Sequence, residues 1–136
     1  MASLYNFSAE TLSELRKFRF SSGRADNMQA IIYAIDKSSN YVTRESESPI
    51  ESIEELMEEL PDNSARYVLL SYPIKLSDGR IKNPFVLLYW RPPTSGQENK
   101  MLYAGAVELF REKAGVSKLI EIEEEEDFEG LEEKLV

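Results

Sequence analysis

The sequence predicts a single α/β (α+β) domain in which a mixed sheet of about five strands lies between helices. Short apolar runs rich in β-branched and aromatic residues alternate with segments of helical periodicity, and this alternation is typical of such a domain. Two of the runs, 66–76 and 80–90, are apolar almost throughout, as expected of central strands that helices cover on both faces. The length of 136 residues and the hydrophobic content of 42% suffice for one core, so we expect residues 1–136 to form one domain.

The first helix is expected to follow a short N-terminal segment that is free to move. Ser8 is suited to cap this helix, because its side-chain oxygen can accept hydrogen bonds from the unpaired amides of the first turn. Phe7 and Leu12 occupy the positions of a hydrophobic staple. Leu15 continues the apolar stripe, and the helix is predicted to end near Phe20.

A pair of strands and a short helix are predicted next. Ala30–Asp36 (AIIYAID) is a β-branched apolar run, and Tyr41–Arg44 is expected to return as its partner strand. Ser52 and Glu55 form a capping box ahead of a two-turn helix, which Pro61 ends.

A hairpin is predicted where Asp78-Gly79 separates the two most apolar runs. Asp-Gly between such runs is the sequence signal of a type I′ turn. The strands 66–76 and 80–90 are therefore expected to form one long hairpin, whose turn they would carry clear of the domain body.

The longest helix is predicted over Lys100–Gly115 (KMLYAGAVELFREKAG). At about 3.6 residues per turn, its residues separate into two faces. The face expected to lie on the sheet holds Leu102, Tyr103, Ala106, Val107, Leu109 and Phe110. The opposite face holds Met101, Ala104, Gly105, Glu108, Arg111 and Glu112.

That opposite face is unusual for one in contact only with water. A Gly inside a helix costs about 0.5–1 kcal/mol relative to Ala, and here Gly105 shares the face with the adaptable side chain of Met101. Met and small residues are typical of surfaces that a partner approaches closely. We therefore predict a binding face, with close packing of Gly105 against a neighbouring strand as the alternative that periodicity leaves open.

The end of the chain is predicted to add a strand, an acidic run and a short helix. Ser117–Ile122 alternates as a last strand, and Glu123–Asp127 is the acidic run. Asp127 is expected to cap a terminal helix whose apolar side holds Phe128, Leu131 and Leu135. A solvated turn is favoured over a cation site in the acidic run, because the interspersed Gly or Asn of a calcium loop is missing.

The net charge of −9 is concentrated at the C-terminal end. Residues 121–136 hold nine acidic residues and one Lys, whereas the first 120 residues hold 16 acidic and 15 basic residues. Because no basic stripe is present, we expect no nucleic-acid partner. No apolar run approaches the roughly 20 residues of a membrane span and no signal segment opens the chain, so we expect a soluble intracellular protein. We also expect it to be a monomer.

The absence of Cys and His excludes several classes of catalyst. It removes thiolate nucleophiles, Ser-His dyads and most zinc sites. Asp, Glu, Lys, Ser and Tyr could still transfer protons, but no cluster of carboxylates and no Gly-rich phosphate loop stands out. We therefore predict that the protein is not an enzyme and uses neither a cofactor nor a metal.

Six segments resemble one known family at corresponding places in the chain. They are Leu15–Phe20 (LRKFRF), Ala30–Lys37 (AIIYAIDK), Glu58–Pro61 (EELP), Ala65–Tyr72 (ARYVLLSY), Asp78–Arg80 (DGR) and Met101–Gly105 (MLYAG). The sequence is similar there to the glia maturation factor family, whose members have the actin-depolymerising-factor homology (ADF-H, cofilin-like) fold. The resemblance covers essentially all 136 residues, and it implies that this chain adopts the same fold.

What the resemblance implies is a regulator of branched actin filaments. Members of the family bind the actin-related protein 2/3 complex through actin-related protein 2 and neighbouring subunits. They inhibit nucleation by the complex and promote debranching, in which daughter filaments detach. By this resemblance we expect the protein in the cytoplasm at cortical branched-actin structures such as actin patches, with the nucleus left open as a second location, and we expect no membrane partner.

The resemblance also implies two partner-binding surfaces. The first surface combines the N-terminal segment with the outward face of the long helix, at Ser3, Leu4, Lys100, Met101, Ala104, Gly105, Glu108 and Arg111. The second surface, which would contact actin at the branch junction, combines the hairpin with the terminal helix, at Asp78, Arg80, Lys82, Glu129 and Glu132. The helical part of the first surface coincides with the face that periodicity predicts for binding.

Two departures from cofilins favour the actin-related partner over actin itself. Cofilins usually place basic residues two apart before the Met, but here Glu98 stands at the first position and only Lys100 remains. The lost cation and the acidic C-terminal region should both weaken docking on the acidic surface of actin. The alternative is a cofilin-type depolymerising factor that binds actin monomers and filaments directly. Ser3 matches the Ser that is phosphorylated in cofilins and is therefore a candidate phosphorylation site.

Overall fold

The computed structural model describes residues 6–22, 27–36, 38–45, 49–116 and 118–135. The elements follow in the order α1 (Ala9–Ser22), β1 (Gln29–Ile35), β2 (Val42–Arg44), α2 (Ile53–Glu59), β3 (Arg66–Ser71), β4 (Ile74–Lys75), β5 (Ile81–Lys82), β6 (Phe85–Trp90), α3 (Gln97–Ala114), β7 (Lys118–Ile122), the 3-10 helix η1 (Glu125–Phe128) and α4 (Leu131–Leu135). Five strands form one sheet in the order β2-β1-β3-β6-β7, while β4 and β5 form a separate two-stranded ribbon. The sheet is mixed, because β6 and β7 are parallel and the other neighbours are antiparallel. The predicted mixed sheet is therefore confirmed.

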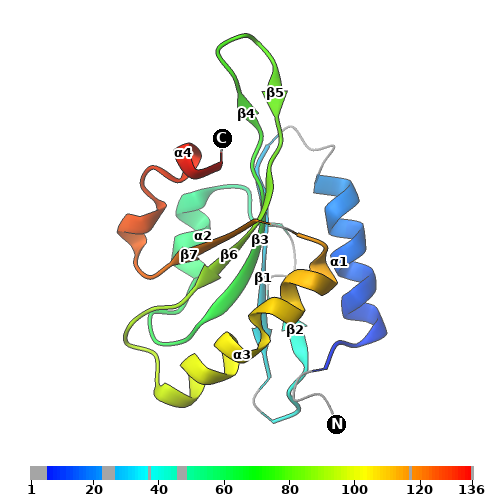
Figure 1. Cartoon of the computed structure of the whole chain (residues 1–136), viewed down its shortest axis with the longest axis vertical. Coiled ribbons are helices and arrows are strands. Elements are labelled where there is room, and N and C mark those ends of the chain that lie inside the picture. Colours follow the sequence, from blue (N-terminus) through cyan, green and yellow to red (C-terminus); the bar gives the residue numbers. More distant parts are fainter. Residues whose placement is uncertain (1–5, 23–26, 37, 46–48, 117, 136) are drawn as a thin grey trace.

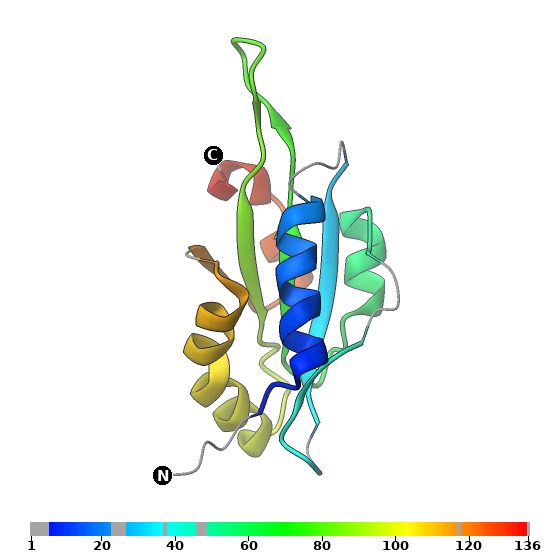
Figure 2. The ribbon, with the colours of Figure 1, turned by 90° about the vertical axis from the view of Figure 1, so that its right-hand side faces the viewer.

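Helices cover both faces of this sheet (Figures 1 and 2). The helices α1 and α3 pack on one face, and α2, η1 and α4 pack on the other. Tyr67 and Leu69 of β3 belong to the first cluster of buried side chains, whereas Val68 and Leu70 belong to the second. Successive side chains of a strand point to opposite faces, so an apolar run without alternation is what a sheet covered on both sides requires.

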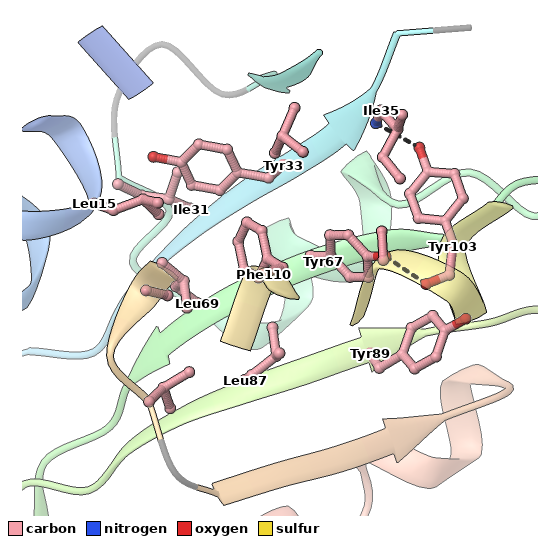
Figure 3. Close-up of a cluster of buried hydrophobic side chains, with 14 of the residues drawn as sticks. Leu15, Ile31, Tyr33, Ile35, Tyr67, Leu69, Leu87, Tyr89, Tyr103 and Phe110 are labelled. Carbon is pink, nitrogen blue, oxygen red and sulfur yellow. Dashed lines mark hydrogen bonds between the residues drawn. The ribbon is translucent and has the colours of Figure 1, made fainter. Parts of the chain in front are cut away.

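Phe110 lies at the centre of the cluster beneath α1 and α3 (Figure 3). Its ring centroid is 4.7 Å from that of Tyr67, 5.5 Å from that of Tyr33 and 6.2 Å from that of Phe7. Aromatic pairs at such separations attract each other beyond the effect of burial alone. The contact with Phe7 also ties the segment before α1 to α3.

Hydrogen bonds confirm Ser8 and Ser52 as helix caps, although within the described residues no bond from the Ser52 backbone to the Glu55 side chain completes the predicted capping box. The side-chain oxygen of Ser8 accepts from the backbone N–H of Thr11 at 3.0 Å. That of Ser52 accepts from the backbone N–H of Glu55 at 3.1 Å. Gly115 ends α3 with a φ of 69°, in the left-handed region that glycine adopts without a steric penalty.

The uninterrupted strands predicted over 66–76 and 80–90 are wrong, because each is divided, although β3–β6 and β4–β5 pair antiparallel in one continuous register and so form the predicted hairpin. Pro73 lies between β3 and β4, and Pro84 lies between β5 and β6. A proline nitrogen cannot donate to a strand ladder, so the two prolines interrupt the pairing between the sheet and the tip. The β4–β5 ribbon nevertheless projects beyond the sheet in both views (Figures 1 and 2).

The predicted type I′ turn is also wrong. The backbone φ is positive at Gly79, at 91°, but not at Asp78, whereas a type I′ turn requires positive values at both central residues. The N–H of Gly79 donates to the carbonyl of Leu76 at 3.0 Å. Residues 77–79 therefore form a three-residue loop in which glycine takes the left-handed position.

Asp127 does not cap the terminal helix, contrary to the prediction. Its carboxylate accepts from the backbone N–H groups of Glu123 at 2.9 Å and Glu124 at 3.3 Å, and so closes the turn that begins η1. Gly130, with a φ of 74°, stands between η1 and α4. The predicted apolar side of this region is confirmed by the burial of Phe128, Leu131 and Leu135.

Candidate functional site

The outward face of α3 presents a flexible apolar side chain beside small residues. Met101 is 65% exposed, and Lys100, Ala104 and Gly105 are exposed with it. Exposure of Gly105 contradicts the alternative in which it packs closely against a strand. The outward face predicted for the first surface is therefore present as a continuous exposed part of the helix.

Glu108 and Arg111 extend this face by one turn. The Glu108 carboxylate lies 3.3 Å from the Arg111 guanidinium, at a spacing of i to i+3 along the helix. Glu108 is exposed and Arg111 is half-buried. Exposed pairs of this kind contribute little to stability, so both charges remain accessible to a partner.

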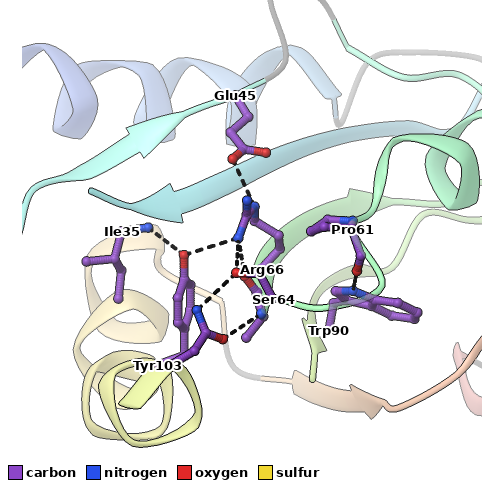
Figure 4. A network of polar contacts seen from close by, with 9 residues as sticks. Ile35, Glu45, Pro61, Ser64, Arg66, Trp90 and Tyr103 are labelled. Atoms are coloured by element: carbon purple, nitrogen blue, oxygen red, sulfur yellow. Dashed lines mark hydrogen bonds and ion pairs between the residues drawn. The ribbon is translucent and has the colours of Figure 1, made fainter. Parts of the chain in front are cut away.

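Buried polar contacts fasten the beginning of α3 to the sheet (Figure 4). The side-chain oxygen of Asn99 accepts from the backbone N–H of Ala65 at 2.8 Å, and its amide donates to Ser64 Oγ at 3.0 Å. The hydroxyl of Tyr103 accepts from the backbone N–H of Ile35 at 2.8 Å. These contacts hold the helix turn that carries Lys100 and Met101.

Sequence reasoning missed this polar anchor. The predicted helix began at Lys100, whereas α3 begins at Gln97 and includes Asn99 in its first turn. A signal was present, because Asn99 and Tyr103 are four residues apart and continue the buried stripe of Phe110. The helix predicted from Lys100 onward excludes Asn99, and Asn is a weak helix former.

Arg66 extends the anchor toward β2. Its guanidinium donates to the carbonyl of Ala65 at 2.7 Å, and its Nε lies 2.9 Å from the carboxylate of Glu45. That second contact is close enough for an ion pair but is not aligned as a hydrogen bond. The start of α3, the start of β3 and the residue after β2 therefore form one polar cluster (Figure 4).

Leu109 does not belong to the buried face, contrary to the prediction. It is half-buried and lines a surface hollow with Glu108, Glu112 and Val116. Successive helical residues are rotated by about 100°, so Leu109 lies to the side of Phe110 rather than beneath it. This apolar side chain adjoins the first surface and does not support the core.

The N-terminal part of the first surface, Ser3 and Leu4, lies outside the described residues. The described chain begins at Asn6, whose backbone pairs with Asn40 and Val42. Phe7 then contacts Phe110 of α3. The described start of the chain, at Asn6 and Phe7, therefore lies beside α3.

The second surface is described at four of its five positions. Asp78 and Arg80 form an exposed ion pair of 2.6 Å at the ribbon tip, and Lys82 is exposed on β5. Glu129 is exposed between η1 and α4, while the side chain of Glu132 lies outside the described residues. Both views place α4 beside the base of the ribbon rather than at its tip (Figures 1 and 2).

Perturbed hydroxyls lie in the core and not on these surfaces. Burial raises the pKa of Tyr33, Tyr89 and Tyr103 above the usual tyrosine range. Among the described residues, no cluster of acidic side chains is arranged to hold a metal ion. Nor does any helix in those ranges combine the length and apolarity needed to cross a membrane.

Comparison with known proteins identifies the family. The family model for cofilin/tropomyosin-type actin-binding proteins matches residues 5–135. Protein AIM7 of Saccharomyces cerevisiae is 43% identical, and the match covers 99% of this chain and 98% of that protein. Glia maturation factor beta of Homo sapiens is 38% identical, with 93% of this chain and 90% of that protein covered. The chain belongs to the glia maturation factor family.

A solved glia maturation factor has the same fold. The solution structure of glia maturation factor from Caenorhabditis elegans is 38% identical to this chain and superposes with a TM-score of 0.78, covering 98% of this chain and 99% of that one. The ADF-H fold predicted by resemblance is thereby confirmed. Glia maturation factors are actin regulators of the ADF-H family rather than enzymes. The partner-binding roles of the individual surface residues stay predictions.

Proposed function

We propose that this member of the glia maturation factor family binds the actin-related protein 2/3 complex, inhibits nucleation by the complex and promotes debranching. Family membership supports the proposal. The observation that carries it in this chain is the exposed Met101, followed one turn later by Ala104 and Gly105. An apolar side chain exposed beside small residues fits a partner that closes over the helix and buries it.

The first surface supplies both an apolar contact and a charge. Met101 would enter an apolar pocket of actin-related protein 2, while Lys100 beside it would meet a carboxylate. Because Ala104 and Gly105 carry almost no side chain, the partner backbone can approach α3 closely in the next turn. Interfaces derive most of their affinity from such a small, fully desolvated centre.

Glu98 supports the complex, rather than actin, as the partner. It is exposed in the first turn of α3, two residues before Lys100, and a carboxylate is electrostatically favourable at a helix N-terminus. The same charge would repel an acidic docking surface, since like charges across an interface disfavour a partner. Glu98 therefore acts against docking on actin without disturbing the helix.

The second surface would serve debranching. Arg80 and Lys82 lie on the projecting ribbon, away from the outward face of α3. In the proposed arrangement, the first surface binds the complex and the ribbon contacts the first actin subunit of the daughter filament. Only a branch presents both partners together, so the ribbon would affect debranching more than binding.

A pull-down with purified components tests the proposal. We expect immobilised protein to retain the purified actin-related protein 2/3 complex and little monomeric actin. Co-sedimentation with bare actin filaments is the companion measurement, with a cofilin as the positive control. Retention of actin but not of the complex would contradict the proposal.

That contrary result would favour the second candidate, a cofilin-type factor that binds actin monomers and filaments directly. The match to a family model of actin-binding proteins is the observation in its favour. In either case we propose that the protein acts in the cytoplasm at cortical branched-actin structures. Imaging of a tagged protein together with the complex would test that location, with the nucleus as the second compartment to inspect.

A further inference from the structure

Negative charge is gathered on one side of the sheet. Residues 45–64 contain eight acidic residues and neither Lys nor Arg, and residues 121–136 contain nine acidic residues and one Lys. The rest of the chain contains eight acidic and 15 basic residues. The two acidic segments supply α2, η1 and α4, which pack on the same face of the sheet. The layer formed by α2, η1 and α4 is therefore strongly acidic, whereas Glu45, the first residue of these segments, lines a hollow beside α1 instead.

Two hollows in this acidic layer share Glu125 and Glu126 as a common wall. The first, of about 320 Å³, lies between α2 and η1 and has Ile53, Met57 and Phe128 as its apolar lining. The second, of about 280 Å³, has Leu60, Trp90, Pro92 and Pro93 as its apolar lining. We call the two hollows together the α2–η1 groove.

The apolar floor of the groove is continuous and held in place. The ring of Phe128 in the first hollow stacks on that of Trp90 in the second, with 6.3 Å between the centroids. The indole N–H of Trp90 donates to the carbonyl of Pro61 at 2.6 Å. A pocket whose lining is already ordered loses little conformational entropy when it binds a ligand.

The carboxylates at the rim of the groove are uncompensated. Glu125, Glu126 and Glu129 are exposed, and within the described part of the chain none of them forms an ion pair with Lys or Arg. Neighbouring like charges repel each other, and a partner that brings cations relieves this repulsion. The groove thus combines an apolar floor with a negatively charged rim.

We propose that the α2–η1 groove binds a basic amphipathic segment of a partner protein. Such a segment would place one aliphatic or aromatic side chain in each hollow, and Lys or Arg beside Glu125 and Glu126. Charge complementarity identifies this occupant, because an anionic lipid surface or a nucleic acid would be repelled by the same rim. The groove is distinct from the outward face of α3, so this site does not depend on the proposed function.

Two labelled peptides of equal charge test the proposal by fluorescence anisotropy at about 0.15 M salt. One is an amphipathic Lys/Leu peptide, and the other has every Leu replaced by Ser. We expect the Lys/Leu peptide to bind at least about tenfold more tightly, because only it can fill the apolar hollows. Equal affinities for the two peptides would overturn the proposal in favour of diffuse charge attraction.

A matched pair of variants locates the binding. E125Q with E126Q neutralises the common wall, whereas E54Q with E58Q makes the same change of charge at exposed positions of α2 that do not line the groove. We expect the first variant to bind the Lys/Leu peptide about tenfold more weakly and the second to bind it nearly as wild type does. Equal losses in the two variants would overturn the proposal.

Two further readouts separate this site from its alternatives. The E125Q/E126Q variant should still retain the actin-related protein 2/3 complex, whereas a variant of Lys100 and Met101 should still bind the peptide. Sedimentation of the protein alone examines self-association. If the wild type self-associates and E125Q/E126Q does not, a second copy occupies the groove and the proposed partner is wrong.

Discussion

The side-chain oxygen of Asn99 lies 2.8 Å from the backbone nitrogen of Ala65, in a hydrogen bond that joins the first turn of α3 to the beginning of β3. Asn99 is only 7% exposed, so water cannot replace this bond easily. Lys100 and Met101 follow Asn99 directly in the chain. The bond therefore fixes the position from which the predicted first surface extends.

Asn99→Ala should lower the free energy of unfolding by about 1–3 kcal/mol, because the buried N–H of Ala65 loses its acceptor. Urea denaturation followed by circular dichroism measures this change. Glu98→Ala is the matched control at the exposed neighbouring position, where we expect a change within about 0.5 kcal/mol. Similar small effects of both substitutions would contradict the anchoring role of Asn99.

Lys100→Ala combined with Met101→Ala should weaken binding of the actin-related protein 2/3 complex and leave the fold intact. Both side chains are exposed, and each residue at the centre of an interface can contribute about 1–3 kcal/mol. Titration of the complex with the variant gives the affinity, and thermal unfolding checks the fold. Lys113→Ala, at an exposed position of the same helix outside the first surface, should bind as the wild type does. A folded double variant of unchanged affinity would rule out this face.

Phe110→Ala should cost about 3–5 kcal/mol of stability as a truncation in the centre of the core. Leu109→Ala should cost less than about 1.5 kcal/mol, because Leu109 is only half-buried and borders a hollow. The two variants differ by one position in the chain, and urea denaturation compares them directly. Equal losses would place Leu109 back in the core.

Helical periodicity predicts the centre of the buried face better than its borders. Tyr103, Ala106 and Phe110 are buried as expected, since they lie on one narrow stripe of the helix. Leu109 lies to the side of that stripe, where the shape of the neighbouring elements decides burial. Asn99 illustrates the opposite error, because its burial depends on a partner 34 positions away in the chain.

Arg80→Glu combined with Lys82→Glu should impair debranching and change binding to the free complex little. Both residues lie on the projecting ribbon, and reversal of exposed charges is usually tolerated by a fold. Debranching is measured by microscopy of branched filaments, and binding is measured on the same preparation. Parallel losses of both activities would indicate one continuous surface. No loss of either would mean that these cations only keep the ribbon soluble.

Stability should fall as the pH rises above about 10, the usual tyrosine pKa in an unfolded chain. Burial raises the pKa of Tyr33 and Tyr103 in the folded state, so above that pH the unfolded chain releases protons that the folded chain keeps. Each such tyrosine lowers the free energy of unfolding by up to about 1.4 kcal/mol per pH unit, between its unfolded and folded pKa values. Below a pH of about 10, these two tyrosines stay protonated in both states and do not make the stability depend on pH.

Tyr33→Phe provides the control for this pH dependence. The hydroxyl of Tyr33 is buried and has no hydrogen-bond partner among the described residues, so its removal should cost little at neutral pH. In the Tyr33→Phe variant, the free energy of unfolding, measured by urea denaturation above about pH 10, should fall less steeply with pH, because one titrating tyrosine is absent. An unchanged slope would show that Tyr33 titrates in the folded protein as it does in the unfolded chain.

The hairpin and the acidic layer show what a linear reading of the sequence leaves out. Pro73 and Pro84 stand inside the two apolar runs, and each divides its run into two strands. The acidic segments 45–64 and 121–136 are far apart in the chain, and only the packing of α2, η1 and α4 on one face brings them together. The breaks at the prolines follow from local chemistry, whereas the acidic layer depends on the topology of the fold.

Because the β4–β5 ribbon lies outside the five-stranded sheet, the length of the ribbon can change without a change in the sheet. Since β3–β6 and β4–β5 share one register, inserting one residue on each side of residues 77–79 would leave the pairing of β3 with β6 unchanged. The tip would move outward by about 3.4 Å for each added pair. The distance between the tip and the helix α3 can therefore be lengthened or shortened, by evolution or by design, without repacking the domain core.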